Sequence, residues 1–164
     1  MGRAVKEVPC TPERYLELAR AVRAAGKFLK VNTVVSRQNV LEDMSEFIRE
    51  LQPHRWKVFQ VLPINGENDR WIKPLLISKP EFDEYVGRHQ VQLMDSGVTV
   101  VPEDNQLMTG SYAMVDPLGR FFDNVDGDLR YGPPILTVGI ERAWQQVRFM
   151  PDRFEKRGGR DYFK

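Results

Sequence analysis

The chain has 164 residues, enough for one domain with a real core, and its 41% hydrophobic and 29% charged residues are ordinary for a globular protein. The formal net charge of +1 argues against a broadly basic nucleic-acid surface, so any anion site must be local. No apolar run approaches the roughly 20 residues that span a bilayer, and the N-terminus lacks the apolar segment of a secretory signal, so we expect no membrane partner and a cytoplasmic location.

The sequence contains one cysteine, Cys10, which excludes an internal disulfide and fits a reducing compartment. Together with the two histidines, His54 and His89, this cysteine cannot build a zinc or iron–sulfur site unaided. We expect Cys10 to be inert and both histidines to lie at the surface.

The first predicted helix covers residues 11–26, where a Thr cap precedes Pro at the first helical position and Gly26 ends the pattern. A strand is predicted over 27–35, a second amphipathic helix over 39–51 and a second strand over 55–62. Because a helix crosses over between them, the two strands should be parallel neighbours.

The pattern changes after Pro63. A loop of mixed polarity is predicted over 64–78, then a helix over 79–97 and a last short helix over 138–150. Short strands are expected over 98–106, 111–116 and 120–124. The chain is therefore predicted to be a βα portion to about residue 66, followed by an irregular α+β extension.

Polar side chains alternate with apolar ones on the two predicted strands of the βα portion. Lys30 and Asn32 share one face of the first strand, and Arg55 and Lys57 share one face of the second. The opposite faces are more uniformly apolar and suit covering helices. Two interpretations are open from spacing alone. Either the four polar residues converge on a phosphate or polyphosphate, or the cations lie at strand ends and snorkel to water.

Four segments resemble the C-terminal half of the viperin family, over about residues 12–160: "LKVNTVVSRQNVLEDM", "RWKVFQVLPINGEN", "VPEDNQLMTGSY" and "RGG" near the end. That family comprises antiviral radical S-adenosylmethionine enzymes with prokaryotic members. The resemblance implies an α/β fold in which residues 1–66 form the last two βα units of a partial (βα)6 TIM-like barrel. Residues 67–164 would form the C-terminal extension that closes over the nucleotide site.

The resemblance also implies a function, that of a nucleotide dehydratase, which is a lyase. In the family a reduced [4Fe–4S] cluster cleaves S-adenosylmethionine, and the 5′-deoxyadenosyl radical abstracts the 4′ hydrogen of a ribonucleoside triphosphate. Loss of the 3′-hydroxyl gives a 3′-deoxy-3′,4′-didehydro nucleotide that terminates viral RNA chains. By motif position, Lys30, Asn32, Arg55 and Lys57 would hold the triphosphate. Direct binding of nucleic acid is not expected.

Some positions depart from the family pattern. Leu107 and Thr109 stand where animal viperins carry lysines, so one phosphate contact from the extension is in doubt unless Arg120 or Arg130 replaces it. Asn65 stands where those proteins have Glu, which indicates a different nucleobase choice. The basic tail over 156–164 is expected to pack over the barrel mouth.

The larger departure concerns the cluster, whose ligation needs a C-x3-C-x2-C run that a chain with one cysteine does not contain. The glycine-rich motif that contacts S-adenosylmethionine is also missing. We interpret the chain as a C-terminal portion of a longer enzyme that lacks the N-terminal part of the barrel. The alternatives are a natural short protein that binds nucleotide without chemistry and an inactive remnant. Carboxylates at Glu67, Asp69 and 126–128 are expected to be solvated rather than catalytic or metal-binding.

Overall fold

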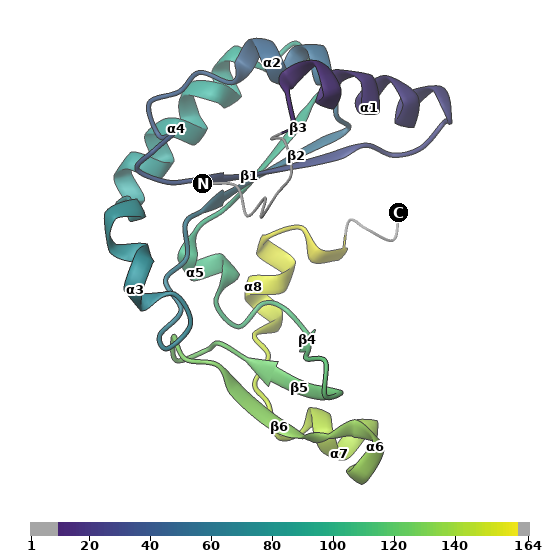
Figure 1. Cartoon of the computed structure of the whole chain (residues 1–164), viewed down its shortest axis with the longest axis vertical. Coiled ribbons are helices and arrows are strands. Elements are labelled where there is room, and N and C mark those ends of the chain that lie inside the picture. Colours follow the sequence, from purple (N-terminus) through teal and green to yellow (C-terminus); the bar gives the residue numbers. More distant parts are fainter. Residues whose placement is uncertain (1–9, 161–164) are drawn as a thin grey trace.

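The computed structural model of the chain describes residues 10–160 and shows a mixed α/β architecture with two sheets. The first sheet is parallel, in the order β1 (Lys30–Val35), β2 (Arg55–Gln60) and β3 (Thr99–Glu103). The second is antiparallel, in the order β4 (Met114–Val115), β5 (Arg120–Asp123) and β6 (Arg130–Pro134). In Figure 1 the parallel sheet lies in the upper half and the antiparallel sheet in the lower half, with α8 (Pro151–Lys156) between them.

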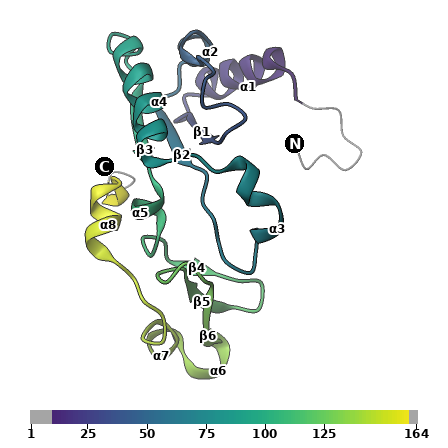
Figure 2. The ribbon, with the colours of Figure 1, turned by 90° about the vertical axis from the view of Figure 1, so that its left-hand side faces the viewer.

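Three helices cover one face of the parallel sheet: α1 (Pro12–Ala24), α2 (Ser45–Leu51) and α4 (Lys79–Gln92) (Figures 1 and 2). Two of these helices begin at capping residues that the sequence shows. Thr11 Oγ1 accepts the N–H of Arg14 at the start of α1, and Ser78 and Glu81 form a reciprocal capping box at the start of α4. The remaining helical segments are short: α3 (Asp69–Ile72), the 3-10 helix η1 (Lys73–Leu75), α5 (Asn105–Met108), α6 (Ile135–Val138) and α7 (Ile140–Trp144).

The hydrophobic core lies between these three helices and the sheet. Trp56, Val58 and Val35 point to this side of their strands and are fully buried. Side chains from α2 and α4 complete the same cluster, including Ile48, Leu51, Phe82 and Tyr85. Burial of this apolar surface is the main stabilising term that the fold offers.

The predicted parallel pairing of the first two strands is confirmed, with a register that places Lys30 opposite Arg55 and Asn32 opposite Lys57. The prediction of only two parallel strands is wrong. The strand Thr99–Glu103, which was assigned to the α+β extension, pairs in parallel with β2, and α4 is the crossover helix between them. The division of the chain at residue 66 stays a prediction, although β3 follows that point and joins the first sheet.

The second helix begins later than its hydrophobic pattern predicts. Asn39 Oδ1 accepts the N–H of Ser36 at 2.8 Å and closes a turn, and Asp43 Oδ1 accepts the N–H of Ser45 at 2.9 Å. Residues 37–41 therefore form turns, residues 42–44 have no regular secondary structure, and α2 starts at Ser45. The sequence also predicted neither β6 nor α8, and it assigned to a loop the residues that form α3 and η1.

The prediction that both histidines lie at the surface holds for His54 and is wrong for His89, which is fully buried. His89 Nε2 accepts the N–H of Met44 at 3.0 Å, and the Nδ1–H donates to the carbonyl of Tyr85 at 2.7 Å. One neutral tautomer satisfies both bonds. Burial lowers the pKa of His89, in keeping with a neutral ring. Within residues 10–160, no helix combines the length and the apolar character needed to cross a membrane.

Candidate functional site

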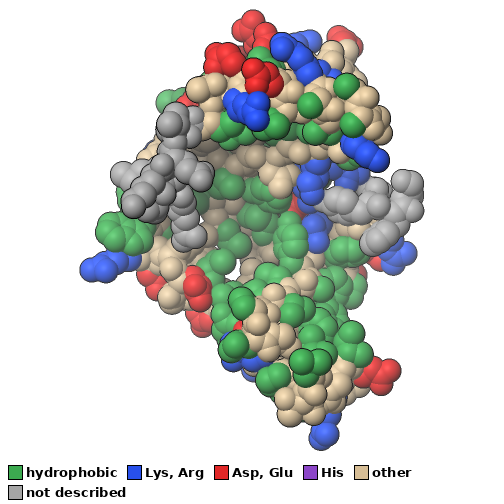
Figure 3. Space-filling model, turned by 45° about the vertical axis from the view of Figure 1, so that its right-hand side comes forward, with side chains coloured by type: hydrophobic (Ala, Val, Ile, Leu, Met, Phe, Trp, Pro, Cys, Tyr) green, Lys and Arg blue, Asp and Glu red, His purple; other side chains and the backbone are tan. Residues whose placement is uncertain are grey.

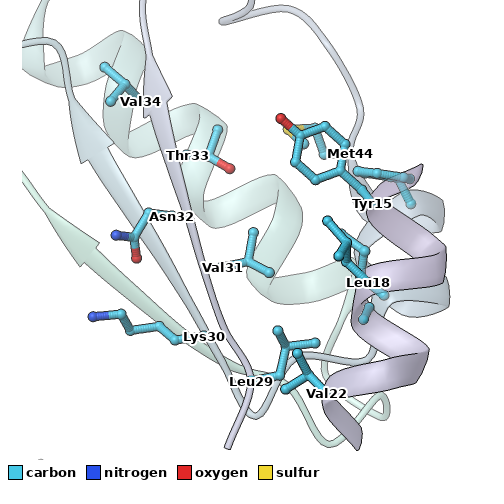
Figure 4. Close-up of a pocket in the computed structure, with 13 residues that line it drawn as sticks. Tyr15, Leu18, Val22, Leu29, Lys30, Val31, Asn32, Thr33, Val34 and Met44 are labelled. Atoms are coloured by element: carbon cyan, nitrogen blue, oxygen red, sulfur yellow. The ribbon is translucent and has the colours of Figure 1, made fainter. Parts of the chain in front are cut away.

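The candidate site is the face of the parallel sheet that the helices leave uncovered. Side chains alternate along each strand, so Lys30 and Asn32 of β1 lie on this face beside Arg55 and Lys57 of β2. Figure 4 shows Lys30 and Asn32 pointing away from α1, whereas Val31 points toward that helix. The structure therefore brings all four predicted residues together as two cross-strand pairs.

Exposure falls steeply across this face of the sheet. Lys30 and Asn32 on the edge strand are exposed, Arg55 is half-buried, and Lys57 is only 2% exposed. The interpretation in which these cations snorkel to water is therefore wrong for Lys57. Lys57 Nζ forms an ion pair with Oε1 of Glu103, which is fully buried at the end of β3. Nζ also lies 5.5 Å from the centroid of the Phe59 ring.

A second cation, Arg157, reaches the same carboxylate from the residue that follows α8. Its Nη1 lies 3.7 Å from Glu103 Oε1, and its Nη2 donates to the carbonyl of Ser111 at 3.0 Å. The guanidinium carbon lies 3.8 Å from the centroid of the Tyr112 ring, and the Tyr112 hydroxyl donates to Glu103 Oε2 at 2.5 Å. We call Lys57, Glu103, Tyr112 and Arg157 the Glu103 cluster.

The Glu103 cluster joins the parallel sheet to the extension. Figure 3 shows a hollow between the upper and lower parts of the molecule, with Lys and Arg side chains along one wall and hydrophobic side chains along others. A carboxylate held between buried cations is a stable arrangement only because each charge has a partner. The same cations can bind an anion that approaches the polar face. Chemically, the arrangement therefore suits recognition of phosphate.

Sequence reasoning missed Glu103 and Arg157, although both lie in segments that carried the family resemblance. It named Arg120 and Arg130 as possible phosphate contacts instead. Arg120 Nε donates to Asp116 at 2.8 Å on the antiparallel sheet, and the exposed Arg130 has its Nη1 3.8 Å from an oxygen of Asp126. Among the described arginines of the extension, Arg157 is the one that contacts Glu103.

The carboxylates that were expected to be solvated are exposed, which confirms that expectation for Glu67, Asp69 and residues 126 and 128. Asp69 Oδ2 accepts the N–H of Gly66 at 2.7 Å, so it stabilises a turn. Asn65 is exposed, and its N–H donates to the carbonyl of Gly127 at 3.0 Å, which ties the loop after β2 to the turn between β5 and β6. No group of three or more His, Cys, Asp or Glu side chains that could hold a metal ion occurs within residues 10–160.

Comparison with known proteins gives several clear relatives, although no protein-family model matches the chain. The chain is 41% identical over 159 residues to an S-adenosylmethionine-dependent nucleotide dehydratase of Flammeovirga pacifica, a match that covers 97% of this chain and 53% of the relative. It is 41% identical over 160 residues to a protein of the same name from Lacinutrix mariniflava, with 97% and 33% covered. It is 43% identical over 136 residues to the S-adenosylmethionine-dependent nucleotide dehydratase RSAD2 of Oncorhynchus mykiss, with 80% and 38% covered.

The chain thus spans about half the length, or less, of these curated relatives. The identity extends through both sheets and includes bacterial and vertebrate proteins. The resemblance that the sequence motifs indicated is confirmed: the chain belongs to the viperin family, as a homologue of part of the S-adenosylmethionine-dependent nucleotide dehydratases.

Proposed function

We propose that the polar face of the parallel sheet binds the triphosphate of a ribonucleotide, and that the chain supplies this part of a nucleotide dehydratase. The observation that supports the proposal is the register of β1 and β2, which sets Lys30 beside Arg55 and Asn32 beside Lys57 on one face. Three cations and an amide on neighbouring strands, whose backbones lie about 5 Å apart, can contact several oxygens of one polyphosphate. The names of the relatives are consistent with a nucleotide as the ligand.

The proposal includes the partial (βα)6 barrel, with residues 1–66 contributing to it and residues 67–164 forming the extension. In this arrangement another parallel strand pairs with the outer edge of β1. A groove of about 550 Å3 runs along that edge and is mostly apolar, with Leu18, Val22 and Phe47 among its lining residues (Figure 4). Among the described strands β1 lies at the edge of its sheet. Val34 of this strand and Leu18 of α1 are about half exposed.

The residues of this chain do not fit a [4Fe–4S] cluster. The sequence holds one cysteine, Cys10, which is exposed, whereas such clusters are held by several thiolates. We therefore assign nucleotide binding to this chain and no chemical step through a cluster. Contact with S-adenosylmethionine and formation of an antiviral chain terminator stay predictions from the family resemblance.

A second candidate function is a nucleotide-binding module that performs no chemistry. It is supported by the polar face, because Lys30, Arg55 and Lys57 can attract a phosphate without any contribution from a cluster. The two candidates share the polar face and differ in whether an N-terminal barrel portion completes it. Turnover in the presence of such a portion would support the dehydratase, and binding without turnover would support the module.

The binding proposal is tested by isothermal titration with ribonucleoside triphosphates and with the corresponding nucleosides. A charge-assisted contact is worth roughly 1.5–3 kcal/mol, so Lys30→Gln, Arg55→Gln or Lys57→Met should each weaken triphosphate binding about tenfold to a hundredfold. Asn32→Ala should cost less, because a neutral hydrogen bond is weaker.

The nucleosides should be nearly unaffected, since they carry no phosphate. Arg14→Gln is the matched control, because Arg14 is an exposed cation on α1 whose partner is Glu17 at 2.8 Å. This variant should bind triphosphate as the unchanged chain does. Equal losses for triphosphate and nucleoside would contradict the assignment of these residues to phosphate.

A further inference from the structure

Another pocket lies at the amino ends of β1 and β2, where the chain turns from α1 into the first strand (Figure 1). It has a volume of about 390 Å3 and is lined by Arg23, Gly26, Lys27, Phe28 and His54. None of the residues proposed to hold the triphosphate lines it. We propose that this pocket binds a nucleoside monophosphate, with the base stacked on Phe28 and the phosphate held by Lys27. The proposal does not depend on the triphosphate site and goes beyond it.

Hydrogen bonds between the residues that precede β1 and β2 hold the pocket together. The carbonyl of Leu29 accepts the N–H of His54 at 2.9 Å, and the N–H of Leu29 donates to His54 Nδ1 at 3.0 Å. These two bonds keep His54 beside Phe28, and the two rings stack with centroids 4.6 Å apart and planes 24° apart. The aromatic surface is therefore in place before a ligand arrives.

Phe28 provides the stacking surface for a base. Its side chain is large and apolar and yet 64% exposed, so much of the ring stays accessible while it stacks on His54. Nucleobases stack on exposed aromatic rings of this kind, and the contact tolerates any base because every base has a flat face. The pocket therefore suits a ligand with a planar ring.

The charge of the pocket is positive, because Arg23 and Lys27 line it and none of its lining residues is acidic. Arg23 is half-buried, and its Nη1 donates to the carbonyl of Leu51 at the end of α2, which fixes the guanidinium at the wall. Lys27 is exposed, and its long side chain can follow a phosphate. His54 adds a neutral donor: because Nδ1 accepts the Leu29 N–H, the ring proton lies on Nε2.

Size and charge together select the ligand. Sites for small molecules have volumes of roughly 300–1,000 Å3, so this pocket is at the small end and suits one base, one sugar and one phosphate. Two cations match the charge of about −1.5 to −2 on a phosphate monoester. Reactions in parallel α/β folds take place at the carboxyl ends of the strands. We therefore assign binding and no chemical step to this pocket at their amino ends.

A purely structural role makes a different prediction. Phe28 and His54 would then only cover the end of the sheet, and Lys27 would only be solvated. No nucleotide would change the surroundings of these residues, and substitutions there would alter stability alone.

The experiment uses the full chain and three probes: adenosine 5′-monophosphate, adenosine and ribose 5-phosphate. Affinities are measured from amide signals in nuclear magnetic resonance titrations, and the monophosphate should shift the signals of residues 26–28 and 54. Phe28→Leu keeps the position apolar and removes the ring. It should weaken the monophosphate and adenosine about tenfold and leave ribose 5-phosphate unchanged.

Lys27→Gln should give the complementary pattern. It should weaken the monophosphate and ribose 5-phosphate about tenfold and leave adenosine unchanged, because adenosine has no phosphate. Arg20→Gln is the matched control, since Arg20 is an exposed cation on α1 that does not line the pocket. This variant should bind all three probes as the unchanged chain does.

Lys27 and Phe28 are exposed, so both variants should fold, and thermal denaturation checks this. If either variant does not fold, the amide shifts of the unchanged chain decide the matter. Absence of shifts at residues 26–28 and 54, or equal losses for all three probes in both variants, would overturn the inference. Either result leaves the proposed function standing, because that proposal is tested with triphosphates and substitutions on the polar face.

Discussion

The two faces of the parallel sheet are built from the same three strands and are unlike in almost every property. On the helix-covered face Val35, Trp56 and Val58 are fully buried and make the core. The alternate residues of the same strands point to the other face. Asn32 and Lys57 lie there, and so does Glu103 at the end of β3. Because alternate residues point to opposite sides, a slip of one residue would exchange the core for the candidate site. The core and the proposed phosphate site are therefore specified by alternate residues of the same strands.

The polar face is itself uneven. Lys30 and Asn32 on β1 are exposed, whereas Lys57 on β2 and Glu103 on β3 are buried where α8 approaches. Substitutions on this face should therefore affect stability little near β1 and strongly near β3. Four tests follow from the contrast between the two faces and from the decrease in exposure across the polar face.

The largest effect is expected from Trp56→Ala, which removes the largest side chain of the buried face. Loss of a buried aromatic side chain and the cavity that remains should lower the free energy of unfolding by about 3–5 kcal/mol. Val34→Ala is the matched control, because Val34 is 55% exposed on the other side of β1. Urea denaturation should show a change within about 0.5 kcal/mol for the control. Similar losses in both variants would refute the assignment of the core to one face.

The next prediction tests whether the side chains of the polar face near β3 contribute to the stability of the fold. Lys57→Met leaves the buried carboxylate of Glu103 without its closest cation and should cost about 3 kcal/mol of stability. The double variant Lys57→Met with Glu103→Leu should be more stable than the sum of the single losses predicts. A coupling energy above about 1 kcal/mol in this double-mutant cycle is expected. Additive losses would show that the two side chains act independently.

A smaller effect concerns α4, which covers the apolar face. Ser78 Oγ accepts the N–H of Glu81, and Glu81 Oε2 accepts the N–H of Ser78 at 2.8 Å. Ser78→Ala removes half of this capping box and should destabilise the chain by about 1 kcal/mol. Ser78→Asp, which can cap the helix in the same way, should restore most of the loss. Failure of this rescue in chemical denaturation would point to a role of Ser78 other than capping.

The smallest effect concerns pH and again the helix-covered face. The folded-state pKa of His89 lies below the ordinary value of about 6.5 because the ring is buried, so the unfolded chain binds the proton more readily. The contribution of His89 to stability is complete above about pH 6.5 and is lost as pH falls toward the lower folded value. Thermal melting measured between about pH 5 and 7 should show this slope.

His89→Gln should flatten the slope in that window. The carboxylate of Asp43, whose pKa the backbone N–H of Ser45 lowers to about 2, stays ionised across this window. Its contribution to stability is lost only at lower pH, so it does not confuse the measurement. An unchanged slope in His89→Gln would show that another group is responsible.

Much of this arrangement could be predicted from the sequence because it depends on local patterns. Alternation along the first two strands correctly separated Trp56 and Val58 from Arg55 and Lys57. Caps and glycines correctly placed α1, and the crossover helix correctly predicted parallel pairing of β1 and β2. These features need only neighbouring residues, whose spacing the sequence states directly.

The rest depends on contacts between distant residues. The strand Thr99–Glu103 has a strand pattern, but nothing local says which sheet it joins, and a Pro within it weakens the signal. The partner of Lys57 is a carboxylate on that strand, so missing the pairing also meant missing Glu103. β6 contains Gly and two prolines, and α8 has only six residues, so neither has a clear pattern. His89 belongs to an apparently polar helix segment and is buried by tertiary packing alone.

The position of Arg157 in the chain has a consequence for biosynthesis. Ribosomes add roughly 5–20 residues per second and release the N-terminal part first, so β1, β2 and β3 leave the exit tunnel some seconds before Arg157 does. During that interval Lys57 and Glu103 can meet, but the guanidinium that contacts the same carboxylate is not yet available. Arg157 therefore reaches Glu103 after the parallel sheet has had time to form. A nascent chain stalled before residue 157 should hold its helices on the sheet and leave Glu103 paired with Lys57 but without its second cation.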